Sequence, residues 1–106
     1  MGDYLVANRG EHGTLRFPMR FLIINEDLAI WSAPVEMFCE ISLNIRSKSP
    51  FPHTFYFGYT NGWIGYLCTR QAYSEGGYEP RTNAFTAQVE DDASKTVITY
   101  LQGHAR

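Results

Sequence analysis

The sequence predicts an α/β (α+β) fold, in which a small mixed sheet that includes a hairpin packs against two main helices. Apolar residues alternate with other residues over 14–24, which is the period of a strand, and a second apolar run follows a cluster of turn residues. Near the C-terminus the apolar residues recur every fourth position, as in a helix. We expect residues 1–13 to form a flexible arm and residues 14–106 to form a single partial domain.

The hairpin is expected between residues 14 and 32. The alternating apolar residues of its first strand are Leu15, Phe17, Met19, Phe21 and Ile23. Pro18 interrupts this strand, and because proline has no N–H to donate, it places the strand at a sheet edge or at a bulge. Asn25-Glu26-Asp27 is typical of a turn, and Leu28 to Ser32 then form the second strand.

The stretch 35–47 can be interpreted in two ways. Cys39, Ile41, Leu43 and Ile45 alternate as in a strand, whereas Glu36, Glu40, Asn44 and Ser47 form a polar stripe on one face of a helix. Ser32 can cap a helix, and Pro34 is tolerated in a first turn. We predict a mostly buried helix over 35–47, with the Glu36 carboxylate at the positive end of its dipole. The prolines at positions 50 and 52 then end it.

The second half of the chain predicts two further strands and two helices. His53 to Tyr59 is aromatic and β-prone, and Asn61-Gly62 predicts a turn or left-handed kink before a strand over Trp63 to Leu67. Thr69 can cap a short helix through Tyr73, which Gly76-Gly77 would end. The terminal amphipathic helix is predicted from Ala93, Val97 and Leu101, with Asp91 and Asp92 at its start and Gly103 at its end.

Composition excludes several classes of partner. With 44% hydrophobic and 15% aromatic residues the chain is not of the disordered type, and a formal charge of −2 offers no basic field to a nucleic acid. No apolar run is long enough for a transmembrane segment, and the first residues lack the pattern of a signal peptide, so we expect a cytoplasmic location. Cys39 and Cys68 are interpreted as buried thiols.

Three stretches carry a family resemblance. They are Ser32-Ala33-Pro34-Val35-Glu36-Met37-Phe38, the run from Ser49 to Tyr66 that contains Asn61-Gly62-Trp63-Ile64-Gly65-Tyr66, and Gly76-Gly77-Tyr78-Glu79. Together they resemble the neutral/alkaline ceramidase family and its bacterial relatives, in which a Pro-Gly-Glu-Phe stretch is followed by Asn-x-x-x-x-Tyr and a Tyr-Glu-Ala-like segment. The sequence departs from this pattern at Val35, where the family favours glycine, and at Gly65, where ceramidases carry larger residues.

The resemblance implies a zinc site. In the family two histidines, one glutamate and one tyrosine hold a catalytic zinc, and Glu36 and Tyr66 match the last two ligands. Asn61, Trp63, Tyr78 and Glu79 are further candidates for roles in the pocket or behind the ligands, with a plain surface charge as the alternative for Glu79. The family's two histidines lie upstream of this segment, so an upstream half would have to supply them.

Other residues leave alternatives open. His53 does not match either family histidine, and we interpret it as a hydrogen-bonded structural residue rather than a replacement ligand. The aromatic residues Tyr56, Tyr59, Trp63, Tyr73 and Tyr78 either fill the core or line an apolar pocket.

Two functions are compatible with these patterns. The first is the C-terminal fragment of a ceramidase-like zinc amidohydrolase, inactive alone for lack of two histidines. The second is a non-catalytic small domain that self-associates or binds a partner. In either case we expect a homo-oligomer, because a segment of a larger domain exposes surface that its missing part would cover.

Overall fold

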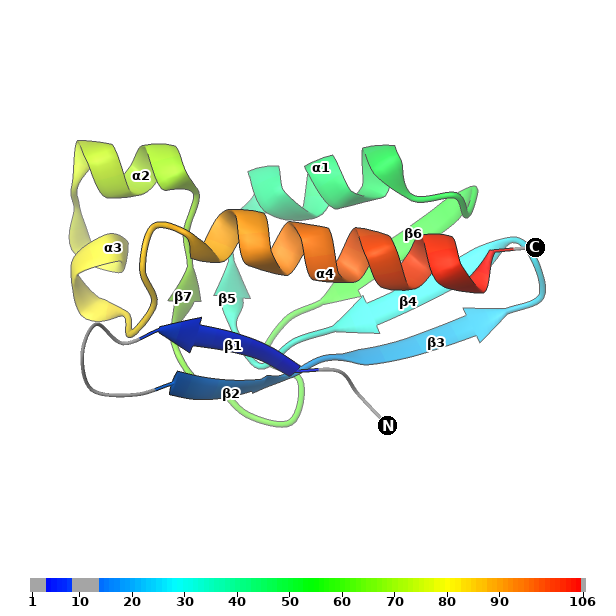
Figure 1. The fold of residues 1–106 in the computed structure, drawn as a ribbon, viewed down its shortest axis with the longest axis horizontal. Helices are drawn as coiled ribbons and strands as arrows, with labels where there is room; N and C mark the ends of the chain where they lie inside the picture. The colour runs from blue at the N-terminus through cyan, green and yellow to red at the C-terminus, as the bar shows by residue number, and fades with distance from the viewer. Residues whose placement is uncertain (1–3, 9–13, 106) are drawn as a thin grey trace.

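The computed structural model describes residues 4–8 and 14–105 (Figure 1). The strands are β1 (Tyr4–Asn8), β2 (Thr14–Pro18), β3 (Arg20–Ile24), β4 (Leu28–Ser32), β5 (Glu36–Met37), β6 (His53–Phe57) and β7 (Tyr66–Leu67). The helices are α1 (Cys39–Lys48), α2 (Arg70–Glu75), α3 (Tyr78–Thr82) and α4 (Val89–His104). The two long helices, α1 and α4, and a mixed sheet confirm the predicted α/β class.

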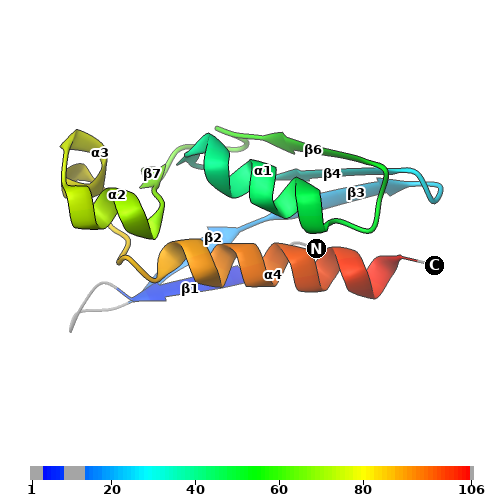
Figure 2. The same ribbon diagram turned by 90° about the horizontal axis from the view of Figure 1, so that it is seen from above.

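The strands form three small sheets. In the central sheet, of order β3-β4-β6, β3 pairs antiparallel and β6 parallel with β4. The antiparallel β1–β2 pair and the parallel β5–β7 pair are separate. Helices α1 and α4 lie on the same side of the central sheet, side by side, as two perpendicular views show (Figures 1 and 2). The fold therefore has one layer of sheet and one layer of helix.

The N-terminal third differs from the prediction in two ways. The strand expected over 14–24 is divided into β2 and β3, which belong to different sheets. The division falls next to Pro18, whose missing N–H weakens a continuous ladder at that point. The stretch 1–13 was expected to be an arm, but Tyr4–Asn8 pair with β2 as β1, because β2 offered an open edge. The remaining residues of that stretch lie outside the described residues.

The helix predicted over 35–47 begins later. Glu36 and Met37 form β5, and α1 starts at Cys39 with Phe38 at its N-cap position and no side-chain cap. Ser32 belongs to β4 and caps nothing, because the chain must first cross to β7. The strand interpretation of 39–45 is wrong. The helix is also not mostly buried: Ile41 and Ile45 are buried, whereas Leu43 is 54% exposed.

The later elements match more closely. The strand predicted over 53–59 ends at Phe57, and Asn61 and Gly62 have positive φ angles of 61° and 134°, as a left-handed kink requires. Only Tyr66 and Leu67 of the expected strand 63–67 are extended in a ladder. The terminal helix α4 buries Ala93, Val97 and Leu101, as predicted, and the short α3 was not predicted.

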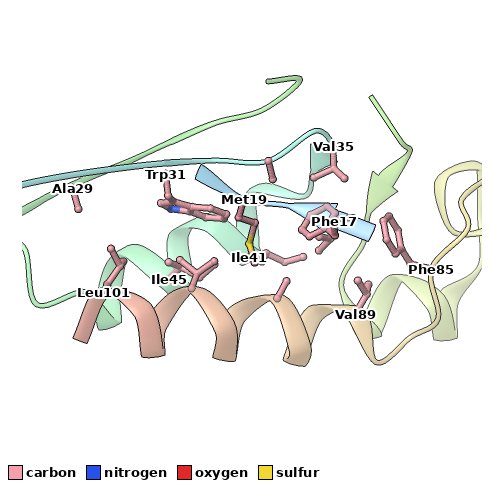
Figure 3. Packing of buried hydrophobic residues seen from close by; sticks show 14 of the residues in the cluster. Phe17, Met19, Ala29, Trp31, Val35, Ile41, Ile45, Phe85, Val89 and Leu101 are labelled. Carbon is pink, nitrogen blue, oxygen red and sulfur yellow. The ribbon is translucent and has the colours of Figure 1, made fainter. Parts of the chain in front are cut away.

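The core lies between the central sheet and the two long helices (Figure 3). Trp31 of β4 is 1% exposed, and its ring packs against Tyr56 of β6 with centroids 4.4 Å apart. Ile41 and Ile45 of α1 and Leu101 of α4 close it from the helix side. Elements that are distant in the sequence meet in this core. Their packing therefore positions the ends of β4 and β6 and the segments that follow these two strands.

The cap of α2 gives a first testable prediction. The Thr69 hydroxyl accepts a hydrogen bond from the Ala72 N–H at 3.1 Å, so it satisfies a donor that the first turn leaves free. We expect Thr69→Ala to lower the free energy of unfolding by about 1 kcal/mol, and Thr69→Ser to change it by much less. Urea denaturation followed by circular dichroism measures both. Equal losses in the two variants would show that the methyl group, not the cap, matters.

Candidate functional site

The parallel pair β5–β7 brings Glu36 and Tyr66 together. The register places Glu36 opposite Tyr66 and Met37 opposite Leu67. Opposed residues of neighbouring strands point to the same face. Leu67 is fully buried and Met37 packs against the core, so Glu36 and Tyr66 lie on the face that points away from it. The two residues that match the last two ligands of the family are therefore adjacent in space.

Backbone hydrogen bonds fix this pairing. The Glu36 N–H donates to the carbonyl oxygen of Gly65 at 3.0 Å, and the Ile64 N–H donates to the carbonyl oxygen of Pro34 at 2.8 Å. On the other side, the Tyr59 N–H donates to the carbonyl oxygen of Val35 at 3.2 Å. The segment before α1 is therefore held between the loop after β6 and the start of β7. This arrangement positions Glu36 although it lies in no helix.

Tyr59 is a polar neighbour of Glu36. A side-chain hydrogen bond with the Glu36 carboxylate raises the pKa of Tyr59 to about 12, from an ordinary value of 10.0; burial and the negative charges of Glu36 and Tyr66 contribute further. The phenol therefore stays protonated at neutral pH beside the carboxylate. A cation that binds Glu36 has to compete with this phenol.

Tyr66 lies in a more enclosed and negatively charged environment. Burial is the largest factor that raises its pKa, followed by the charge of Glu36 and those of Tyr78, Glu79 and Cys68. A carboxylate disfavours a neighbouring phenolate, whereas a divalent cation between them would favour it. Without a cation, Tyr66 is a neutral phenol.

Two further aromatic rings stand around Tyr66. Trp63 meets it edge to face with centroids 5.8 Å apart, and Tyr78 meets it in the same way at 6.0 Å. Trp63 and Tyr78 are 52% and 60% exposed, so they do not fill the core. They form an open aromatic rim around the Glu36–Tyr66 pair.

A small polar network around Asn83 lies near the Glu36–Tyr66 pair. The Asn83 amide donates to the Glu79 carbonyl oxygen at 2.9 Å and lies 3.4 Å from the Cys68 sulfur, and its oxygen accepts from the Tyr73 hydroxyl at 2.8 Å. Burial raises the pKa of the Cys68 thiol to about 11, so it is not a thiolate at neutral pH. This network ties α2 and α3 to β7.

The other predicted residues fall as follows. Asn61 is exposed in the turn between β6 and β7, and Glu79 is half-buried at the start of α3. His53 is exposed at the start of β6, and its backbone N–H donates to the Asp27 carbonyl oxygen at 3.0 Å. Cys68 is buried as predicted, whereas Cys39 is exposed, because it begins α1 on the solvent side.

Asn83 was missed from the sequence, and Tyr59 was considered only as a core or pocket residue, not as a neighbour of Glu36. The bond between Tyr59 and Glu36 and the role of Asn83 depend on contacts between segments far apart in the chain. Tyr59 has a positive φ of 54° directly after Gly58, an unusual conformation for a tyrosine. The neighbouring Asn61-Gly62 indicated a left-handed turn. Nothing in the sequence indicated that Tyr59, just before this turn, lies beside Glu36.

The residues present fit part of a zinc site. A carboxylate and a phenol side by side are two oxygen donors, and a second carboxylate, Glu79, adds negative charge around them. No group of three His, Cys, Asp or Glu side chains within the described residues could hold a metal ion. Zinc takes four ligands in most protein sites, so further donors would be needed.

The comparisons with known proteins identify the fold. No family model matches the sequence, and no curated protein matches it. Among solved structures, the fold is similar to segments of longer chains that are ceramidases. The chain is similar to the neutral ceramidase from Pseudomonas aeruginosa, with a TM-score of 0.65 and 18% identity over 81% of this chain and 14% of that one.

A second structure, of a ceramidase complexed with C2, has a TM-score of 0.70 and 18% identity over 88% of this chain and 16% of that one. Likeness at this identity shows the fold, and it confirms the resemblance found in the sequence. The chain spans only 14% and 16% of the two ceramidase chains. No helix of the described residues is long and apolar enough to cross a membrane.

Proposed function

We propose that this chain is the part of a ceramidase-like zinc amidohydrolase that contributes Glu36 and Tyr66 as metal ligands. The observation that carries the proposal is the β5–β7 register, which makes partners of two residues thirty positions apart in the sequence. The similarity of the fold to ceramidase structures supports the proposal, because that similarity extends over most of the chain and not only over these two residues. Two histidines from polypeptide outside the described residues complete the ligand set.

The chemistry of the proposed site follows from its donors. A bound zinc would supply an acidified water and a Lewis acid for amide hydrolysis. Glu36 contributes a charged oxygen, and Tyr66 contributes a phenol that loses its proton only when a cation offsets the negative charge around it. The Tyr59 phenol, whose pKa the Glu36 carboxylate raises, stays neutral beside that carboxylate. Trp63 and Tyr78 shield the pair from solvent on its open side.

A zinc titration with added imidazole tests the proposal. Two ligands leave the ion largely hydrated, so we expect weak or no binding to the metal-free chain alone. Free imidazole can stand in for the absent histidines, and we expect it to strengthen zinc binding about tenfold or more, with a tyrosinate signal in the ultraviolet difference spectrum. Calorimetry in matched imidazole buffers measures the affinity.

Variants decide which residues are responsible. Glu36→Gln and Tyr66→Phe should each remove the effect of imidazole, and Tyr66→Phe should also remove the tyrosinate signal. Tyr78→Phe is the matched control, because its ring packs on Tyr66 but its hydroxyl is not a proposed ligand. Zinc binding that survives both ligand substitutions would refute the site. A tight site lost in His53→Ala would show that His53 binds the metal instead.

A non-catalytic, self-associating domain is the second candidate. It is favoured by one observation, which is the large apolar surface that the described fold leaves open on the sheet side. Oligomers that persist when all metal is removed would support it.

A further inference from the structure

Helix α3 carries Tyr78 but has no apolar anchor of its own. None of its five residues is buried, and Tyr78 is 60% exposed. The Arg81 side chain donates to the Gly77 carbonyl oxygen, and the Thr82 hydroxyl likewise bonds within the helix. A helix of this length is not stable alone in water. Yet the ring of Tyr78 packs edge to face on Tyr66, with centroids 6.0 Å apart, so contacts outside the helix must hold it against β7.

Asn83, the residue directly after α3, is anchored through its side-chain oxygen. This oxygen accepts from the Phe85 N–H at 2.9 Å and from the Tyr73 hydroxyl at 2.8 Å. A backbone N–H can only donate, so this bond itself fixes which end of the amide is the oxygen. Phe85 is 6% exposed and meets Phe17 edge to face, with centroids 5.7 Å apart, in the core cluster (Figure 3). The oxygen end of the amide is therefore tied to the core.

The nitrogen end of the same amide joins α3 to β7. It donates to the Glu79 carbonyl oxygen of α3 at 2.9 Å, and to the sulfur of Cys68, directly after β7, at 3.4 Å. An asparagine NH₂ group has two donors, and these two bonds use both. A Cβ at Gly65 would lie 3.6 Å from the Cβ of Asn83, which is an ordinary packing distance. Asn83 thus contacts the chain before and after Tyr66.

Helix α2 is attached independently of Asn83. The Arg70 N–H donates to the Glu90 carboxylate at 2.7 Å, and the Arg70 guanidinium pairs with Asp91 at 2.7 Å. Both carboxylates belong to the first turn of α4. Loss of the bond from Tyr73 to Asn83 therefore leaves α2 attached, whereas loss of the two amide donors removes the link between α3 and β7.

We propose that Asn83 is a positioning residue of the candidate site, which holds Tyr78 of α3 against Tyr66 of β7 through the two donors of its amide. Asn83 acts through Cys68 and the Glu79 carbonyl oxygen, and it binds neither metal nor substrate. The placement of Tyr78 needs no metal, whereas its effect on zinc binding rests on the proposed function. Residues behind metal ligands matter for affinity because they fix the orientation of the ligands.

NMR spectroscopy of the metal-free chain tests the placement. Asn83→Asp keeps the shape of the side chain and the oxygen that accepts two hydrogen bonds, but it replaces both donors with a second oxygen. We expect this variant to lose the nuclear Overhauser contact between the rings of Tyr66 and Tyr78. The contact between Trp63 and Tyr66 should remain, because Trp63 lies before β7 and not on α3. Its persistence distinguishes release of α3 from general unfolding.

Tyr73→Phe is the matched control. It removes one hydrogen bond to the same amide, on the oxygen end, and leaves both amide donors in place. We expect it to retain the contact between Tyr66 and Tyr78, even where its urea midpoint falls as far as that of Asn83→Asp. Retention of the contact in Asn83→Asp, or its loss in Tyr73→Phe as well, would overturn the inference.

A zinc titration in imidazole connects the placement with the site. Here Asn83→Ala is the variant of choice, because an added carboxylate would itself attract the ion, and it also repeats the NMR test if Asn83→Asp does not fold. We expect its zinc affinity to fall about tenfold at a temperature where it and the wild-type chain are both folded. An unchanged affinity in a variant that has lost the contact between Tyr66 and Tyr78 would show that Asn83 is only a stabilising residue.

The two measurements separate this inference from the proposed function. A wild-type chain that binds no zinc in imidazole would refute the proposed metal site, and the NMR comparison would still decide whether Asn83 holds Tyr78. A wild-type chain that binds zinc, with both Asn83 variants unchanged in the ring contact, would refute the role of Asn83 and leave the metal site standing.

Discussion

Trp31→Ala is expected to lower the free energy of unfolding by about 3–5 kcal/mol, the largest single effect that we predict. Trp31 is 1% exposed, packs on Tyr56 and lies in the core cluster with residues of both long helices (Figure 3). Its removal leaves a cavity between the central sheet and the two long helices, and this cavity can close only in part because other core residues keep these elements apart. A domain of this size is stable by only about 5–15 kcal/mol, so this loss is a large share of the total. Urea denaturation followed by circular dichroism measures it.

The second tryptophan provides the control. Trp63 is 52% exposed, so Trp63→Ala removes the same atoms but creates no closed cavity, and we expect a change of about 0.5 kcal/mol or less. If Trp31→Ala does not fold, Trp31→Phe retains most of the buried surface and should remain folded with a smaller loss. Equal effects of the two alanine substitutions would show that the core described here is not the stabilising one.

Gly58→Ala is expected to be the second largest change, with a loss of about 1–3 kcal/mol in the free energy of unfolding. A Cβ at Gly58 would lie 2.9 Å from the carbonyl oxygen of Val35 and 3.2 Å from the Tyr56 hydroxyl. The Val35 oxygen accepts hydrogen bonds from that hydroxyl and from the Tyr59 N–H, so it cannot move without breaking them. The substitution should therefore also displace Tyr59 from Glu36.

Two measurements separate the local effect from the general one. Thermal denaturation gives the loss of stability, and an NMR titration of the tyrosine ring carbons gives the pKa of Tyr59, which should fall from about 12 toward 10.0 when the hydrogen bond to Glu36 is lost. Gly103→Ala is the matched control, because a Cβ there meets nothing within 4 Å and lies in a helix. It should be neutral or slightly stabilising. An unchanged Tyr59 in Gly58→Ala would contradict the proposed link.

Local patterns were sufficient where one element carries its own signal. The terminal helix was predictable because Ala93, Val97 and Leu101 recur at the helical period and an acidic first turn precedes them. The cap at Thr69 and the kink at Asn61-Gly62 were predictable because each depends on the backbone chemistry of a few neighbouring residues. The pairing of Glu36 with Tyr66 was also expected, but from the family resemblance and not from any local pattern.

Errors occurred where two distant segments decide the local structure. The sequence around Glu36 is compatible with a first helical turn. The N–H groups of Glu36 and Phe38 instead donate to the carbonyl oxygens of Gly65 and Leu67, which makes Glu36 part of a strand. Residues 4–8 have no pattern of their own and became β1 because β2 presented an edge. For Glu36 the competing partner is thirty residues away in the chain, so no short window of sequence contains the interaction, whereas β2 follows β1 closely and only the lack of a strand pattern in residues 4–8 hid their pairing.

The sequence by itself thus determined the fold class, the terminal helix α4 and the two residues that the ceramidase resemblance selects. Only the tertiary structure decided where α1 begins, which face each strand turns outward, and that Tyr59 lies beside the Glu36 carboxylate. The physical reason is that alternation of side chains between the two faces of a strand is a local property. Which of the two faces becomes buried depends on the elements that pack against the strand, and these are distant in the sequence.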